Sequence, residues 1–260
     1  VWSTISYHAA HQRKDQYMIQ VEQVSISLQH VPIVCDATFS VEKGKIIMLL
    51  GENGCGKTTL IRGMVNEIPL SQGKITFKGK DVSQMSIRER AAVFSYIPQI
   101  KPLIDQLYCR DVVVSGLCRQ MHFIQIPSQS DYQKAYDIMR SFDIHQLFDK
   151  KIDEISGGQL QLVYLCRSFI QDAACILMDE PCTYLDFMKQ HLFLEYTRKL
   201  KQKGCSVLLS IHDPNLALTY GDEILFMHQG KIIANLSGST SAREELQTLY
   251  RSIYHQDIHF

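Results

Sequence analysis

The sequence predicts an α/β fold in which a parallel sheet with flanking helices is preceded by an antiparallel β layer and interrupted by a helical insertion. Three observations predict it. The apolar run Lys45 to Leu50 suits a buried strand and is followed by a glycine-rich turn at Gly51 to Thr59. A second apolar run, Cys175 to Met178, ends in two adjacent carboxylates. Residues 100 to 155 show helical spacing and few strand patterns, which indicates an inserted helical subdomain.

The first part of the chain is expected to be mostly β structure. Residues 1 to 17 lack the apolar core of a secretory signal, so we expect an N-terminal tail, with the fold beginning at Met18. Alternating apolar and polar residues predict a half-buried strand at 19 to 28. The further elements predicted here are strands at 34 to 42 and 45 to 50, a helix at 58 to 66, and strands at 73 to 79 and 94 to 97.

The second part is expected to alternate helices and strands. Gly204 is expected to end one helix, and Asp213-Pro214 to begin another, because an acidic N-cap followed by proline is typical of a helix start. The predicted helices are 110 to 117, 131 to 142, 157 to 171, 187 to 203, one beginning at 213, and 242 to 255. The predicted strands are 175 to 178, 206 to 211, 223 to 227 and 231 to 236.

Composition describes a globular protein with balanced charge. The chain has 260 residues, of which 45% are hydrophobic, and its formal net charge is zero. Such a chain has no overall basic field to attract nucleic acid, so we predict no nucleic-acid partner. Its longest apolar runs, such as Ile46 to Leu50, are far shorter than the roughly 20 residues that cross a bilayer, so no membrane span is expected. The 8 cysteines form no CxxC pair, which favours free thiols in a reducing compartment.

The glycine-rich turn matches the P-loop pattern GxxxxGK[ST], which binds nucleotide phosphates. Backbone N–H groups of the turn and the N-terminus of the following helix surround phosphate oxygens in such a loop. Lys57 can reach the β- and γ-phosphates, and the Thr58 hydroxyl can hold Mg²⁺. The predicted nucleotide-binding residues of the turn are Gly51, Glu52, Asn53, Gly54, Cys55, Gly56, Lys57, Thr58 and Thr59.

Cys55 differs from the other cysteines because it lies inside the phosphate-binding turn. The positive potential at a helix N-terminus favours the thiolate form of a cysteine. We therefore expect alkylation of Cys55 to block nucleotide binding and bound ATP to protect the thiol.

Asp179 and Glu180 are candidate catalytic and metal-binding residues at the end of the second apolar run. Open α/β sheets bind their ligands beyond the carboxyl ends of the strands. We expect Asp179 to hold Mg²⁺, directly or through water, and Glu180 to orient and deprotonate the attacking water. Behind a P-loop, this pair predicts hydrolysis of a nucleotide, with ATP and Mg²⁺ as ligands.

The segment ISGGQ supplies a second candidate phosphate site. A serine before two glycines is a common helix cap, but the exposed N–H groups and the helix dipole also form an anion site. Ser156 lies far along the chain from Lys57, so we expect a head-to-tail homodimer in which each ATP lies between the P-loop of one protomer and the Ser-Gly-Gly segment of the other. The predicted residues of this second half-site are Ser156, Gly157, Gly158 and Gln159.

These motifs together resemble the ATP-binding-cassette (ABC) ATPase family over about residues 18 to 236. Gln99 in YIPQ looks like the family's Q-loop residue, which senses Mg²⁺ and water. Tyr184-Leu185-Asp186 looks like the D-loop that touches the opposite protomer, and His212 looks like the switch histidine that contacts the γ-phosphate. The resemblance thus implies Gln99, Glu180 and His212 as catalytic residues, Thr58, Gln99 and Asp179 as metal-site residues, and Asp186 as a further residue at the nucleotide.

The same resemblance implies a domain organisation. A P-loop NTPase core of the RecA type would comprise residues 18 to 98 and 157 to 236. A helical subdomain would cover 99 to 156, and a C-terminal helix 237 to 260.

Several stretches, among them the one at Phe123 to Tyr132 and HDPNLAL at His212 to Leu218, are similar to the ATPases of iron-siderophore, haem and cobalamin importers. That resemblance implies an ATPase homodimer on the cytoplasmic face of the membrane, separate permease subunits, and an extracytoplasmic substrate-binding protein. The alternative is a soluble ABC ATPase without a transport role, for example in iron–sulfur assembly or DNA repair.

Three departures from the family pattern accompany the resemblance. Leu28 occupies the position where the family usually stacks an aromatic ring on adenine, so we predict modest ATP affinity and loose base selectivity. Cys182-Thr183 replaces the more usual Thr-Ser after the paired carboxylates. The segment Gly116 to His122 departs from the importers' common Gly-Arg-x-Pro-His, which weakens the assignment of a substrate.

Overall fold

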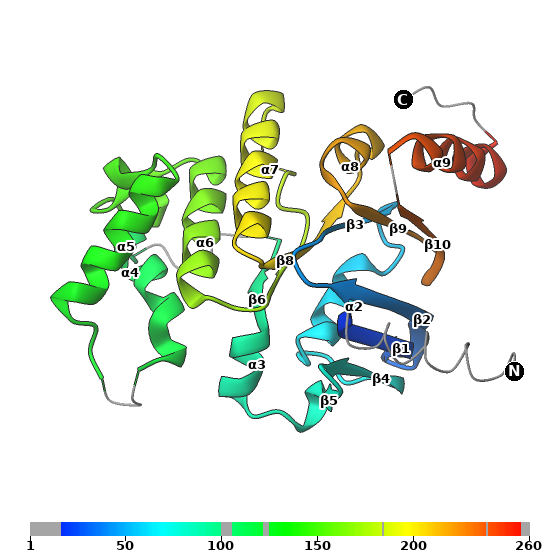
Figure 1. Cartoon of the computed structure of the whole chain (residues 1–260), viewed down its shortest axis with the longest axis horizontal. Helices are drawn as coiled ribbons and strands as arrows, with labels where there is room; N and C mark the ends of the chain where they lie inside the picture. Colours follow the sequence, from blue (N-terminus) through cyan, green and yellow to red (C-terminus); the bar gives the residue numbers. More distant parts are fainter. Residues whose placement is uncertain (1–16, 100–105, 122–124, 184, 238, 256–260) are drawn as a thin grey trace, which may run out of the picture.

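The computed structural model of the chain describes residues 17–99, 106–121, 125–183, 185–237 and 239–255. The predicted tail up to residue 16, His122 and Tyr184 lie outside these ranges. Two sheets and a group of helices make up the described part (Figure 1). The α/β class predicted from the sequence, with an antiparallel layer, a parallel core and a helical insertion, is confirmed.

The antiparallel layer lies at the N-terminal side. It consists of β1 (Tyr17–Leu28), β2 (Val31–Glu42), β4 (Gln72–Phe77) and β5 (Lys80–Asp81), in the order β2-β1-β4-β5. The pairs β1–β2, β1–β4 and β4–β5 are all antiparallel. The alternating pattern of β1 is that of a strand with one buried face, because Ile19, Val21, Val24 and Ile26 are buried.

The second sheet carries the ends of the strands on which the site is built. It contains β3 (Ile46–Gly51), β6 (Phe94–Ile97), β7 (Cys175–Met178), β8 (Ser206–Ile211), β9 (Glu223–His228) and β10 (Lys231–Ser237). Their order is β10-β9-β3-β8-β7-β6. The pairs from β9 through β3, β8 and β7 to β6 are parallel, and β9–β10 is an antiparallel hairpin. The carboxyl ends of β3, β8, β7 and β6 therefore lie next to one another.

The unbroken apolar sequence of β3 is explained by burial on both faces. Ile46, Met48 and Leu50 pack into the core that contains the larger helices, whereas Ile47 and Leu49 pack into the core shared with the antiparallel layer. A parallel strand covered on both sides needs apolar residues at every position. The sheet is thus the wall between two cores.

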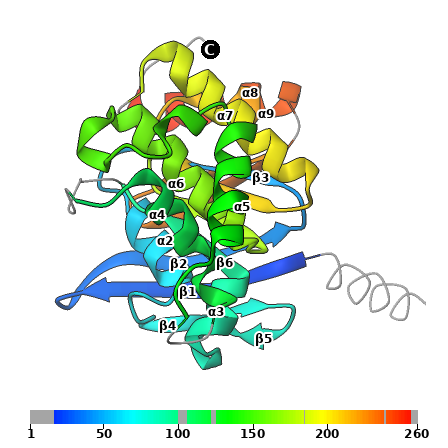
Figure 2. The ribbon, with the colours of Figure 1, turned by 90° about the vertical axis from the view of Figure 1, so that its left-hand side faces the viewer.

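The helices cover the two faces of this sheet. The P-loop helix α2 (Lys57–Met64) contributes to the core on the side of the antiparallel layer. On the other side lie α4 (Cys109–Val114), α5 (Gln129–Ser141), α6 (Gly157–Gln171), α7 (Phe187–Gln202), α8 (Pro214–Tyr220) and α9 (Ser239–Tyr254). Figure 1 shows α4, α5 and α6 grouped at one end of the molecule, and Figure 2, which looks at this end, shows α5 in front.

Most predicted boundaries agree with the structure to within a few residues, but α3 (Ile87–Val93) was missed. Its signal was present: Ser86 and Glu89 form a capping box, in which the Ser86 hydroxyl accepts from the Glu89 N–H and the Glu89 carboxylate accepts from the Ser86 N–H. The short strand β5 and the 3₁₀ turn η2 (Ser115–Arg119), which ends the predicted helix at 110 to 117, were also missed.

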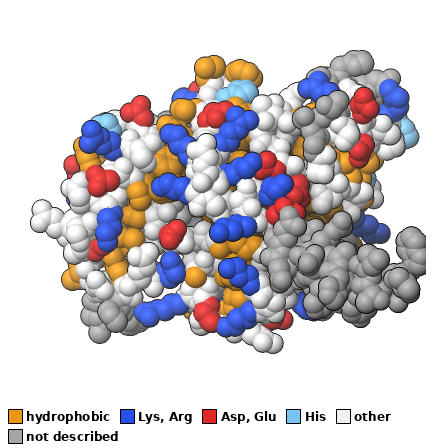
Figure 3. All heavy atoms as spheres, viewed as in Figure 1, with side chains coloured by type: hydrophobic (Ala, Val, Ile, Leu, Met, Phe, Trp, Pro, Cys, Tyr) orange, Lys and Arg blue, Asp and Glu red, His pale blue; other side chains and the backbone are white. Residues whose placement is uncertain are grey.

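The surface agrees with the balanced composition. Basic and acidic side chains are interspersed over the face shown in Figure 3, without a broad field of one sign. Within the described ranges, no helix combines the length and apolar character needed to cross a bilayer.

Candidate active site

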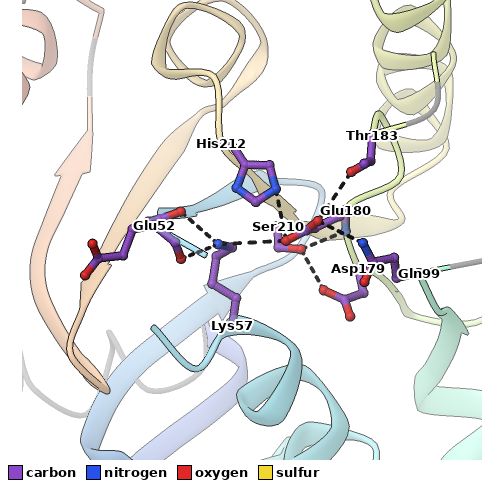
Figure 4. A network of polar contacts seen from close by, with 9 residues as sticks. Glu52, Lys57, Gln99, Asp179, Glu180, Thr183, Ser210 and His212 are labelled. Atoms are coloured by element: carbon purple, nitrogen blue, oxygen red, sulfur yellow. Dashed lines mark hydrogen bonds and ion pairs between the residues drawn. The ribbon is translucent and has the colours of Figure 1, made fainter. Parts of the chain in front are cut away.

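Neighbouring strands bring four predicted segments to one edge of the parallel sheet. The P-loop follows β3, and the segment of His212 follows β8. Asp179 and Glu180 follow β7, and Gln99 lies two residues beyond β6. Because these four strands are adjacent and parallel, residues from distant parts of the sequence meet beyond their carboxyl ends (Figure 4).

The P-loop is held close to its neighbours by glycines. A Cβ at Gly51 would lie 2.3 Å from the Met227 carbonyl oxygen, and a Cβ at Gly56 would lie 2.9 Å from the Ile33 carbonyl oxygen. Gly56 also has a φ of 109°, which side-chain-bearing residues rarely adopt. The Glu52 carboxylate lies 3.0 Å from Nδ1 of His228 on β9, and the Glu52 carbonyl oxygen accepts from Lys57 Nζ.

Lys57 is a buried cation, 4% exposed, at the start of α2. Its Nζ donates to the carbonyl oxygens of Gly51, at 2.8 Å, and Glu52, at 2.9 Å. The nearest described carboxylate is that of Glu180, at 4.0 Å. The ammonium group is thus folded back over its own loop and only weakly compensated by negative charge, as expected of a group that receives a phosphate.

The Glu180 carboxylate receives donors from several segments. Its Oε1 lies 3.0 Å from Nε2 of His212 and 4.0 Å from Nζ of Lys57. Its Oε2 accepts from Nε2 of Gln99 at 3.1 Å and from Oγ1 of Thr183 at 3.3 Å. The structure therefore brings together the predicted residues Gln99, Glu180 and His212 around Lys57.

Asp179 is 1% exposed, and burial raises the pKa of its carboxyl group. The side chains of Thr58 and Ser210 act in the opposite direction and favour the carboxylate. Its Oδ2 is buried and has no hydrogen-bond partner among the described residues. An unpartnered carboxylate oxygen beside a threonine hydroxyl fits the oxygen donor set that Mg²⁺ prefers.

Two polar residues of this cluster were missed by the sequence prediction, Ser210 and Thr183. Ser210 Oγ donates to Asp179 Oδ1 at 2.9 Å and accepts from the Glu180 N–H at 2.8 Å. A signal for Ser210 existed, because it is a polar residue near the end of a fully buried strand whose residues 207 to 209 are all apolar. Thr183 was noted as a departure from the family pattern without a role.

The ISGGQ segment lies at the N-terminus of α6, as predicted. The Ser156 hydroxyl accepts from the Gln159 N–H at 3.3 Å, and the Gln159 side chain accepts from the Ser156 N–H at 3.0 Å. Gly158 lies close to the segment just before α7, since a Cβ at this position would lie 2.7 Å from Leu185 Cδ2. Asp186 caps α7 through the Lys189 N–H at 3.0 Å. None of the contacts found among the described residues joins these groups to Lys57 or Glu180.

The expectation that the Cys55 thiol favours the thiolate form is wrong. The residue is only 4% exposed, and burial raises the pKa of its thiol above the ordinary value. The nearby Lys57 charge and a backbone hydrogen bond act in the opposite direction but are smaller effects. Desolvation thus outweighs the helix N-terminus, and the neutral thiol is favoured.

Comparison with known proteins agrees with this geometry. A sequence profile of the ABC transporter family matches residues 34–183. The chain belongs to the ABC transporter family. It is 30% identical, over 92% of its length and 97% of the relative, to a probable iron chelatin transport ATP-binding protein of Helicobacter pylori strain J99. It is also 30% identical to the manganese transport system ATP-binding protein MntB of Bacillus subtilis strain 168, over 90% of this chain and 92% of the relative.

The fold of this ABC transporter ATPase also matches solved structures. One is an inward-facing conformation of a putative metal-chelate type ABC transporter, with a TM-score of 0.78, 24% identity, and coverage of 93% of this chain and 90% of that one. As a member of the family, the chain binds ATP.

The raised pKa of Cys55 predicts slow alkylation. Below its pKa a thiol is mostly neutral, so raising the pKa lowers the thiolate fraction near pH 8, and burial limits access of the reagent. We expect iodoacetamide to modify Cys55 at least about tenfold more slowly than the exposed Cys118. Peptide mass spectrometry over time measures the two rates. Equal rates at the two cysteines in the folded chain would contradict this, and Cys55→Ser identifies the correct peptide.

Proposed function

We propose that this ABC transporter ATPase hydrolyses ATP with Glu180 as general base and that it powers an importer of iron-siderophore, haem, cobalamin or a related metal chelate. The observation that carries the first part is the position of the Glu180 carboxylate, among donors from the P-loop lysine, Gln99 and His212. The second part is supported by relatives whose names refer to transport of iron chelatin and of manganese. Free metal ions are therefore the competing cargo.

In the proposed reaction the backbone N–H groups of the P-loop bind the phosphates, and Lys57 turns from its own loop toward the β- and γ-phosphates. A water oxygen attacks the γ-phosphorus while Glu180 accepts the water proton, and the bond to the β-phosphate oxygen breaks to release ADP. His212 donates through Nε2 to the oxygens that gain negative charge. Gln99 orients the attacking water.

Mg²⁺ fits the residues at the end of β7. Thr58 and Asp179, with Gln99, would hold the ion, and the unpartnered Asp179 Oδ2 is the oxygen available for it. When bound, the ion supplies positive charge that neutralises the phosphate oxygens.

We propose further that a second copy of the chain completes each site. Ser156 to Gly158 present the N-terminus of α6, but within one chain this segment makes no described contact with Lys57 or Glu180. A head-to-tail homodimer would place it, with Asp186, on the ATP held by the partner. Closing and opening of this dimer would drive separate permease subunits at the cytoplasmic face of the membrane, which receive cargo from an extracytoplasmic binding protein.

Glu180→Gln tests the role of the general base. The amide cannot accept the water proton, so we expect turnover to fall by about 10² to 10⁴ while ATP binding remains intact. Steady-state phosphate release and equilibrium binding of ATP measure the two effects. Glu154→Gln, outside the strand ends, is the control and should hydrolyse like the native chain. A Glu180→Gln variant with normal turnover would remove Glu180 from this role.

A mixing experiment tests the composite site. Lys57→Ala and Ser156→Arg damage opposite halves, so we expect each variant alone to be inactive. Random mixed pairing gives about half heterodimers, each with one intact site, and we expect roughly a quarter of native activity to return. Two affinity tags show that heterodimers have formed. Heterodimers that form without any recovery of hydrolysis would contradict trans-completion.

Uptake measurements test the cargo. In cells deleted for this chain we expect loss of uptake of radiolabelled iron chelates but not of radiolabelled Mn²⁺, with recovery by the native chain and none by Glu180→Gln. Loss of Mn²⁺ uptake alone would favour a metal-ion importer. Unchanged uptake of both, with purification beside soluble partners only, would favour the non-transport alternative.

A further inference from the structure

Ser210 is the only residue in the described part of the chain whose side chain connects directly to both carboxylate-bearing residues of the site. It lies in β8, fully buried at 0% exposure, and pairs across the sheet with Leu49 of β3. Its hydroxyl donates to Asp179 Oδ1 and accepts from the backbone N–H of Glu180 (Figure 4). One small side chain therefore fixes the positions of two consecutive residues just beyond the neighbouring strand β7.

We propose that Ser210 is a positioning residue that sets Asp179 for the metal ion and Glu180 for the attacking water before ATP binds. This inference rests on the roles proposed above for Asp179 and Glu180. Neither family membership nor the relatives assign a function to this serine.

The contact with Asp179 determines which of its oxygens remains open. Oδ1 accepts from the Ser210 hydroxyl at 2.9 Å, and Oδ2 is buried and has no hydrogen-bond partner in the described part of the chain. A carboxylate held by one oxygen cannot rotate freely about its side-chain bonds, so the other oxygen keeps a fixed direction. Outer hydrogen-bond partners of this kind orient metal ligands and strengthen metal binding.

The contact with Glu180 holds an unfavourable backbone conformation. Glu180 has a φ of 47°, in the left-handed region that costs energy for a residue with a side chain. Its N–H is kept in place by Ser210 Oγ at 2.8 Å, while the Thr183 N–H donates to its carbonyl oxygen at 3.3 Å. Without the serine hydroxyl, the Glu180 N–H loses its described partner at the point where the strand turns.

Ser206, at the start of the same strand, provides a matched comparison. It is equally buried, at 0% exposure, and its hydroxyl also donates and accepts. Its partners are the Glu42 carbonyl oxygen at 2.8 Å and the Gly44 N–H at 2.9 Å, at the opposite end of the strand from the site. Removing either hydroxyl costs stability in the same way, but only Ser210 touches the carboxylates.

The experiment compares Ser210→Ala, Ser206→Ala and Ser210→Thr in the full chain. ATP affinity is measured in EDTA and again with saturating Mg²⁺, Mn²⁺ binding to the ATP complex is followed by EPR, and kcat and KM are determined. For Ser210→Ala we expect unchanged affinity in EDTA, about tenfold weaker Mn²⁺ binding, and a kcat lower by about tenfold. Ser206→Ala should keep native metal binding and kcat, and Ser210→Thr, which retains the hydroxyl, should recover most of both.

Two further variants separate failure of this inference from failure of the proposed function. Ser210 has no positioning role if Asp179→Asn weakens metal binding and Glu180→Gln lowers turnover while Ser210→Ala behaves like Ser206→Ala. The proposed roles themselves fail if Asp179→Asn leaves metal binding unchanged and Glu180→Gln leaves turnover unchanged. Equal loss of thermal stability in the two alanine variants, with loss of metal binding only at Ser210, supports the inference.

Discussion

The constraint on which the site depends is a buried ammonium group. Lys57 is 4% exposed, and a desolvated cation needs compensation. Its two hydrogen bonds go to carbonyl oxygens of its own loop, and the closest described carboxylate is 4.0 Å away. The site therefore presents a weakly compensated ammonium group at the edge of the sheet. In the proposed function, a polyphosphate is the ligand that relieves this imbalance, so ATP takes part in the electrostatic balance of the site.

The same imbalance links ATP binding to the release of Glu180. The Glu180 carboxylate accepts hydrogen bonds from Gln99 and Thr183, and it lies 3.0 Å from Nε2 of His212 and 4.0 Å from Nζ of Lys57. A carboxylate engaged by several donors is a weaker proton acceptor. In the proposed mechanism, phosphates attract Lys57 and the developing charge attracts His212, so two of these contacts weaken. In the proposed mechanism the base is therefore activated by the substrate it acts on.

Much of the fold and part of this site followed from the sequence, because strand burial leaves a local signal. The bounds of β6, β7 and β8 were predicted from short apolar runs, and the P-loop and paired carboxylates from motifs. Ser210 and Thr183 were not, because their partners depend on which strands become neighbours, and a local pattern does not contain the strand order. The thiolate prediction for Cys55 failed for another reason. A helix N-terminus lowers the pKa of a thiol and burial raises it, and only the structure shows how deeply the thiol is buried.

The two phosphate-binding segments differ in how complete each is within one chain. Around Lys57, a buried cation and an unpartnered Asp179 oxygen are left for ligands. Ser156 instead exchanges two hydrogen bonds with Gln159, since its N–H donates to the Gln159 side chain and its hydroxyl accepts from the Gln159 N–H, and Gly158 is packed against Leu185. The α6 segment therefore needs no ligand to be stable and can add its helix N-terminus to a phosphate without rearranging. In the proposed dimer, the α6 half adds to ATP that the P-loop half of the partner holds.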